Sequence, residues 1–172
     1  MRSSHLSLLA ALAAVSVGCN DERQSTPPSA PQAVAANALA AYIAVSDANP
    51  SPGSEVTVSV RALRGAAVGP IGSFTLRVAY DSTRLRFVSA ARSTDGMVMT
   101  NSSAAGIVVA AGASAQGFLS DELLSMRFAV TGAEAVASLQ LSVSELNSMH
   151  FENQTSALRI ERAIYQSRSV EK

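Results

Sequence analysis

Apolar and polar residues alternate along most of the chain from residue 41 onward, in short runs separated by turn-forming residues. The clearest run spans residues 72–90 (GSFTLRVAYDSTRLRFVSA). Successive side chains of a β-strand point to opposite faces, so this run predicts two strands that each bury one face. Asp81, between them, is expected to stabilise the turn through its side chain. The residues on the inward phase are Phe74, Leu76, Val78, Tyr80, Leu85 and Phe87.

The same alternation predicts seven further strands. They lie at residues 42–45, 56–60, 97–99, 107–110, 124–130, 139–143 and 158–162. Nine short strands with frequent turns, and no long amphipathic helix, are typical of an all-β, antiparallel β-sandwich. We therefore predict one sandwich domain over residues 40–165, followed by a C-terminal tail at residues 166–172.

The beginning of the chain predicts a targeting segment and a tether. Residues 6–17 (LSLLAALAAVSV) are apolar but too short to span a bilayer comfortably, as in the core of a signal peptide over residues 1–18. The residues before Cys19, the only cysteine, resemble the lipobox of bacterial lipoproteins. This resemblance implies a lipid on Cys19 and, since Asn20 follows, sorting to the outer membrane in a Gram-negative cell. The alternative is an ordinary secretory signal with an incidental cysteine. Residues 19–39, rich in Pro, Ser and Ala, predict a flexible tether.

Composition excludes several classes of function. The 172 residues include 13 basic and 13 acidic residues, so the formal net charge is zero and nucleic-acid binding is not expected. Beyond the signal peptide, His150 is the only histidine and no further cysteine occurs, so we expect no catalytic triad. The sequence has no phosphate-binding glycine loop and no metal-ligand spacing. We therefore expect neither catalysis nor a cofactor.

Three segments resemble the cohesin domains of bacterial cellulosomes, in the family's order and spacing. Residues 52–60 (PGSEVTVSV) are similar to its second strand, and residues 74–88 (FTLRVAYDSTRLRFV) to its third and fourth strands. Residues 123–130 (LLSMRFAV) and 137–142 are similar to two later strands. The resemblance covers residues 40–165. It implies a nine-stranded sandwich of jelly-roll topology, related to carbohydrate-binding modules.

The resemblance also implies where a partner would bind. Cohesins bind a calcium-loaded dockerin module across one sheet, through outward residues of the third, fifth and sixth strands. Ser73, Thr75 and Arg77 occupy the matching face, with Ser73 and Thr75 at the family's Asn and Asp positions. Thr75 lacks the carboxylate found there in the family, which favours a divergent partner over a standard dockerin. The alternative is that these residues form only a solvated strand face.

A second set of candidate residues is basic. The family's strand order places the second, seventh and fourth strands side by side in the other sheet, with Arg61, Arg127 and Arg86 on their outward phases. They would form a basic stripe that meets an acidic protein, a lipid headgroup layer or an anionic glycan. The alternative is solubilising charge scattered over that face.

Direct carbohydrate binding is a second function to consider. Sandwiches that bind sugars usually stack exposed aromatic rings on the ligand, and this chain has no tryptophan. The aromatic residues outside the inward phases are Tyr42, Phe118, Phe151 and Tyr165. They do not predict a flat aromatic platform, but they allow a loop site with one aromatic ring.

Together, these features predict a non-catalytic, extracytoplasmic binding module that is held at the membrane by a lipid on Cys19. Its partner would be a dockerin-like or other secreted protein, in an assembly that degrades polysaccharide. Direct binding of polysaccharide is the alternative function. A structural role in the cell envelope is the third.

Overall fold

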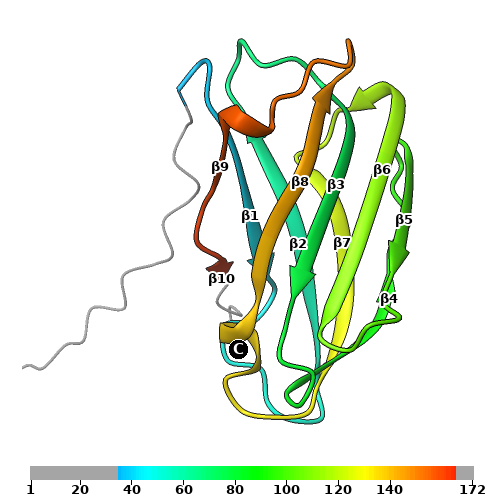
Figure 1. Cartoon of the computed structure of the whole chain (residues 1–172). Helices are drawn as coiled ribbons and strands as arrows, with labels where there is room; N and C mark the ends of the chain where they lie inside the picture. Colours follow the sequence, from blue (N-terminus) through cyan, green and yellow to red (C-terminus); the bar gives the residue numbers. More distant parts are fainter. Residues whose placement is uncertain (1–34, 166–172) are drawn as a thin grey trace, which may run out of the picture.

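Two β-sheets pack face to face in the computed structural model, which describes residues 35–165 (Figure 1). The larger sheet has six strands, namely β1 (Leu39–Val45), β2 (Glu55–Arg64), β4 (Leu85–Ala90), β7 (Glu122–Val130), β9 (Leu158–Ile160) and β10 (Ile164–Tyr165). The smaller sheet has four, namely β3 (Ile71–Ala79), β5 (Met97–Asn101), β6 (Ile107–Phe118) and β8 (Gln140–Ser148). The all-β sandwich predicted from the alternation is confirmed.

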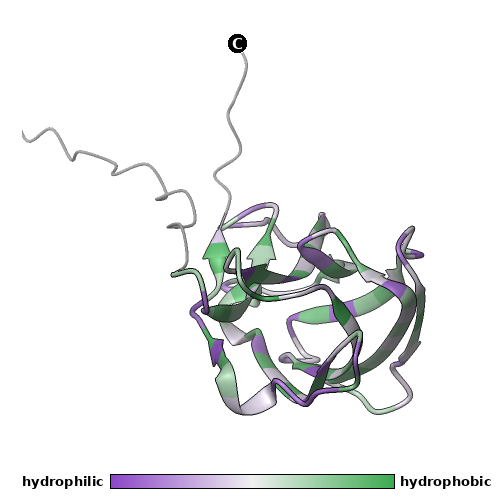
Figure 2. Cartoon of the chain, turned by 90° about the horizontal axis from the view of Figure 1, so that it is seen from above, coloured by the Kyte–Doolittle hydropathy of each residue, from purple (hydrophilic) through white to green (hydrophobic). Residues whose placement is uncertain are grey.

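The order of the strands in each sheet brings distant segments together. The larger sheet runs β10-β1-β2-β7-β4, with β9 also paired to β1, and the smaller sheet runs β5-β6-β3-β8. Two short 3-10 helices, η1 (Ala135–Ser138) and η2 (Thr155–Ala157), lie before and after β8. Figure 2 looks at the sandwich from above and shows the strands arranged around the space that the core fills.

The first strand of the described residues belongs to the larger sheet. β1 begins at Leu39, one residue before the predicted start of the domain, and the Leu39 side chain is buried in the core. The predicted signal peptide, Cys19, residues 19–34 of the tether and the tail at residues 166–172 lie outside the described residues.

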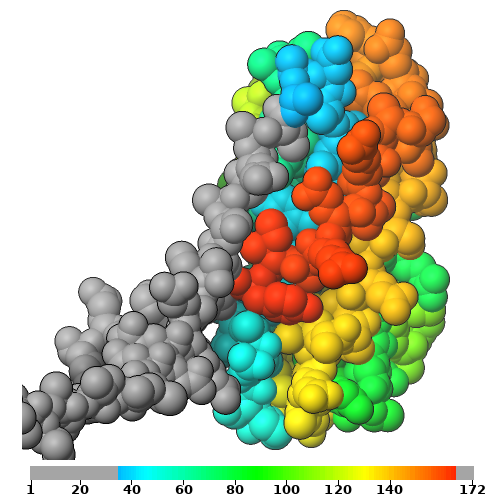
Figure 3. Space-filling view, turned by 90° about the vertical axis from the view of Figure 1, so that its left-hand side faces the viewer, coloured from blue at the N-terminus to red at the C-terminus, as the bar shows by residue number. Residues whose placement is uncertain are grey.

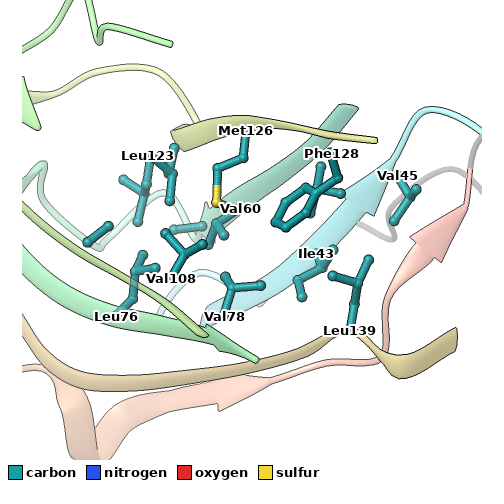
Figure 4. Packing of buried hydrophobic residues seen from close by; sticks show 14 of the residues in the cluster. Ile43, Val45, Val60, Leu76, Val78, Val108, Leu123, Met126, Phe128 and Leu139 are labelled. Atoms are coloured by element: carbon teal, nitrogen blue, oxygen red, sulfur yellow. The ribbon is translucent and has the colours of Figure 1, made fainter. Parts of the chain in front are cut away.

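The core consists of the inward residues of both sheets. Of the set predicted from residues 72–90, four side chains are at most 1% exposed, and Tyr80 and Phe87 pack partly buried against them. Figure 4 shows how residues of one sheet meet those of the other: Leu76, Val78 and Val108 face Val60, Met126 and Phe128. Burial of each large side chain stabilises the fold by about 1.5–3 kcal/mol. The predicted inward set is confirmed.

Aromatic contacts fix the connection between β3 and β4. The ring of Phe128 on β7 lies 5.0 Å from the ring of Tyr80 and 5.7 Å from that of Phe87, both in edge-on geometry. Each such pair adds about 0.5–1.5 kcal/mol beyond its buried area. Tyr80 directly follows β3 and Phe87 lies in β4, so Phe128 contacts residues on both sides of the turn.

The side chain of Asp81 stabilises that turn as predicted. Its Oδ1 accepts hydrogen bonds from the backbone N–H of Thr83 at 2.9 Å and from the Thr83 hydroxyl at 2.6 Å. The Arg84 guanidinium lies 3.2 Å from its Oδ2. These contacts favour the charged carboxylate, and the hydrogen bonds from Thr83 lower the pKa of Asp81 most.

Two details of the larger sheet differ from the sequence prediction. The strand predicted at residues 158–162 is the shorter β9, and a further strand, β10, follows it. Both pair with β1 in parallel, so the sheet is not purely antiparallel. The physical reason is the connection after β8. The chain passes through η2 to the other sheet and then runs alongside β1 in the same direction (Figure 1). Residues 35–165 therefore contain ten strands, where nine are predicted.

A β-bulge interrupts β8. Thr75 on β3 is paired with Glu145, but the next residue, Leu76, is paired with Val143, so Ser144 is an extra residue in the ladder. The bulge changes the phase of the alternation. Leu141 and Val143 point toward the core on one side of it and Leu146 on the other, so Glu145 points outward.

Candidate functional site

The outer face of the four-stranded sheet carries the site residues predicted on β3. We call it the four-strand face. The strand registers arrange its outward residues in three rows across β5, β6, β3 and β8. The rows are Met97, Ala113, Ser73 and Asn147; Met99, Ala111, Thr75 and Glu145; and Asn101, Val109, Arg77 and Ser142.

One half of the four-strand face is apolar. Met97 and Met99 on the edge strand β5 are 68% and 69% exposed, and Val109 on β6 is 39% exposed. The exposed Ala111 and Ala113 lie between the methionines and β3. Small side chains beside two long, flexible thioethers form a shallow surface that can adapt to the shape of an apolar partner.

The other half is a connected set of polar side chains. The amide nitrogen of Asn147 donates to the Ser73 hydroxyl at 3.0 Å and to Glu145 Oε1 at 2.7 Å. The Thr75 hydroxyl donates to Glu145 Oε2 at 3.4 Å. These bonds hold the Glu145 carboxylate over β3, where it retains the capacity to accept further hydrogen bonds.

The structure places all three predicted residues on this one face. Ser73 and Thr75 are half-buried beside β8, and Arg77 is exposed. The sequence analysis missed Glu145 and Asn147, which complete the polar half. Regular alternation from Leu141 predicts that Glu145 points inward, and only the bulge turns it outward. A carboxylate at a nominally buried position was the signal that could have revealed the bulge.

The three arginines of the predicted basic stripe lie on the opposite sheet, on the neighbouring strands β2, β7 and β4. Two of them have acidic neighbours, so the charge of this face is mixed. Arg61 lies 3.8 Å from Glu122, and Arg127 lies 3.5 Å from Glu55. Such exposed pairs contribute about 0–1 kcal/mol each. The exposed Arg86 is paired in register with Ala129.

The aromatic candidates for carbohydrate binding separate into two groups. Phe118 is fully buried, with its ring 5.1 Å from that of Phe74, and Tyr42 is 3% exposed. Neither ring can stack on a ligand, so the prediction that Phe118 and Tyr42 are candidates for sugar binding was wrong. Tyr165 is half-buried, whereas Phe151 is 88% exposed.

The described residues were also compared with the requirements of a metal site and of a membrane-spanning helix. Between residues 35 and 165, no three His, Cys, Asp or Glu side chains gather in a way that could hold a metal ion. No helix in the same range is long and apolar enough to cross a membrane.

Comparison with known proteins identifies the fold. No family model and no curated protein matches the sequence. Among solved structures, the cohesin CaCohA2 from Clostridium acetobutylicum has a TM-score of 0.57 at 13% identity, over 78% of this chain and 94% of that chain. A non-cellulosomal cohesin from the archaeon Archaeoglobus fulgidus has a TM-score of 0.54 at 16% identity, over 73% and 87%.

A third similar structure is part of a complex. The matched chain belongs to the type I cohesin–dockerin complex Coh-OlpC-Doc435 from Clostridium thermocellum, with a TM-score of 0.55 at 11% identity, over 78% of this chain and 97% of that one. All three comparisons cover most of both chains. This chain therefore has the fold of the cohesin modules.

Proposed function

We propose that the four-strand face binds a protein partner and that the domain acts as a non-catalytic docking module. The observation that supports this most is the composition of the face. An exposed apolar half at Met97, Met99 and Val109 lies directly beside a preorganised polar half around Glu145. Specific protein interfaces commonly combine an apolar centre with hydrogen-bonding groups of fixed orientation.

The apolar half provides the surface that a partner would remove from water. Two methionines on an edge strand and a valine beside them are unusual on a face that only solvent covers. Methionine suits such a surface because its flexible thioether adapts to different side chains. A partner that covers this half needs an apolar stripe, as an amphipathic helix has.

The polar half gives orientation to the same partner. Glu145 would accept hydrogen bonds from a hydroxyl or a basic side chain, and Asn147 and Thr75 hold its carboxylate in place. Similar structures include cohesins solved together with dockerins. A dockerin-like module is therefore the first partner class to test. The acidic residue of this face lies on β8 and not at Thr75, which favours a divergent member of that class.

The proposed location follows from the first residues of the chain. A lipid on Cys19 would anchor the protein at the outside of a membrane, and residues 20–34 would hold the domain away from the lipid surface. This arrangement suits the display of a docking module to secreted proteins, including those that degrade polysaccharide.

The test is recovery of a partner by the purified protein from culture supernatant, with and without calcium. We expect a protein that is retained by the wild type and that binds Met99→Ser or Glu145→Gln about tenfold more weakly, equivalent to about 1.4 kcal/mol. Arg86→Ser, on the opposite sheet, is the matched control and should bind as the wild type does. Equal retention by all three variants, or no partner in either condition, would contradict the proposal.

A further inference from the structure

Strand β5 forms one edge of the four-stranded sheet, at the right of Figure 1. On one side it is paired with β6 over all of its residues, from Met97 to Asn101, without a register shift. On the other side its backbone has no partner among residues 35–165. Such an edge presents N–H and C=O groups that can pair with a further strand.

The sequence of β5 lacks the features that usually protect an edge from other strands. It reads Met-Val-Met-Thr-Asn and contains no charged residue and no proline. The side chains of Met97 and Met99 are exposed. The strand is also regular, since no bulge interrupts its pairing with β6. The edge is therefore open to another strand.

The other edges of the two sheets are protected. β8 carries a bulge and the outward Glu145, and its end is bridged to the chain that follows it through Asn147 and Asn153. Figure 3 shows that side of the molecule, where the orange and red segments that follow β8 lie beside it. β4 has a register shift and carries the charged Arg86, and β9 and β10 have only three and two residues. Of the edges that residues 35–165 form, only β5 is thus regular, uncharged and longer than three residues.

A second copy of the same strand is complementary to this edge. Two β5 strands that run antiparallel about their middle residue, Met99, engage all of their residues. Met99 then lies opposite Met99 of the second copy, Val98 opposite Thr100, and Met97 opposite Asn101. Side chains in opposite positions contact each other, and none of these pairs brings like charges together. The chain has no net formal charge, so the two copies do not repel each other at long range.

This pairing also joins the apolar halves of two four-strand faces. In each copy, β5 and the neighbouring β6 carry the exposed Met97, Met99 and Val109. The apolar strands of the two copies would be contiguous in one sheet of eight strands, and the two Met99 side chains would lose contact with water. Each copy uses the same edge, so the contact is isologous and the assembly is complete with two copies.

We propose that the protein forms a two-fold symmetric dimer through antiparallel pairing of its two β5 strands. The dimer has one continuous sheet with two four-strand faces, so that the polar half around Glu145 occurs twice, once on each side of the shared apolar centre. This inference goes beyond the docking function and does not depend on it, because the pairing needs no partner protein.

The test is the oligomeric state of the purified full chain, measured by sedimentation velocity over a range of concentrations. Every sample carries Cys19→Ser, so that neither a lipid nor a disulfide joins two copies. We expect a reversible dimer. Met99→Lys and Met99→Glu each place like charges opposite one another at the two-fold axis and should weaken dimerisation about tenfold or more. An equimolar mixture of the two variants should restore the dimer, because opposite charges then face each other.

Val109→Lys is the matched control. It adds the same charge to the same face, but on β6 and away from the edge, so this variant should dimerise as the wild type does. Amide hydrogen exchange should show protection of every N–H from Met97 to Asn101 in the dimer, and only of those that face β6 in Met99→Lys. Protection elsewhere in the sandwich reports that the variant is folded.

Four results would overturn the proposal. They are a wild type that stays monomeric at all concentrations, wild-type dimerisation in Met99→Lys, and a mixture of the two charged variants that stays monomeric. The fourth is an equal loss of dimer in Val109→Lys, which would indicate that two four-strand faces stack on each other instead of pairing at the edge.

Discussion

Glu145 Oε2 lies 3.4 Å from the hydroxyl oxygen of Thr75, across the ladder between β8 and β3. A carboxylate from the neighbouring strand β8 therefore lies beside Thr75. Asn147 fixes its orientation through Glu145 Oε1. The face thus has an acidic acceptor on its edge strand β8, although β3 itself contains none.

The bulge in β8 makes the effect of deletions there depend on position. Deleting Ser144 restores regular alternation with Val143 and Leu146 inward and Glu145 outward. We expect a loss of about 1 kcal/mol or less, since only the hydrogen bond from Ser144 to the Thr75 carbonyl disappears.

Deleting Ser142 is the matched control. It forces either Leu141 or Val143 outward, at a cost of about 1.5–3 kcal/mol. Urea unfolding of the two variants measures the difference. Equal destabilisation by both deletions would mean that the bulge does not absorb the extra residue.

Gly112 lies on the inner face of β6, where the rings of Phe74 and Phe118 leave no room for a side chain. A Cβ atom added there would lie 2.5 Å from Cζ of Phe74 and 3.1 Å from Cζ of Phe118. Gly112→Ala should therefore lower the free energy of unfolding by about 1–3 kcal/mol. Gly69→Ala, whose added Cβ meets no atom within 4 Å, is the control and should leave thermal stability nearly unchanged.

Asp81 should contribute to the pH dependence of stability. Its pKa is lowered in the folded state, first by the hydrogen bonds from Thr83 and then by the charge of Arg84. A lowered pKa stabilises the folded state above the ordinary value of 3.8, and this stability is lost as the pH falls from there through the folded-state pKa. In Asp81→Asn, the free energy of unfolding should therefore fall less steeply as the pH is lowered through this range. Denaturation at a series of pH values measures the difference. Asp121→Asn, in the exposed turn before β7, serves as the control.

Phe151 should lower the free energy of unfolding of the domain. A non-glycine residue in the left-handed region costs about 1–2 kcal/mol, and its exposed ring gains little from packing. Phe151→Asn should therefore stabilise the domain by about 1 kcal/mol, since asparagine is more often found in this region. Phe151→Leu keeps the strained angle without the ring and should give no gain. Urea midpoints of the two variants distinguish strain from loss of the ring.

Alternation alone predicted the sandwich and most of its core, because residues such as Phe74, Leu76 and Leu85 follow one phase without interruption. It failed where the ladder is irregular. Glu145 is turned outward by a single inserted residue, and its carboxylate at a nominally inward position is the sign of that bulge in the sequence of β8. Phe118 follows a stretch of small residues and was expected to be accessible, yet its ring closes on Phe74 in the core. Such contacts depend on the register between distant strands, and one sequence does not encode that register locally.

The parallel pairing of β1 with β9 and β10 has a mechanical consequence. Leu39 is paired with Leu158 at one end of this ladder, and Val45 with Tyr165 at the other. A force that pulls the chain outward at Leu39 and at Tyr165 would act along the strand axes in opposite directions. It would load the hydrogen bonds between these strands in shear, all together rather than one after another. The pairing of the first strand of the domain with its last two strands is thus the part of the sheet that would resist tension.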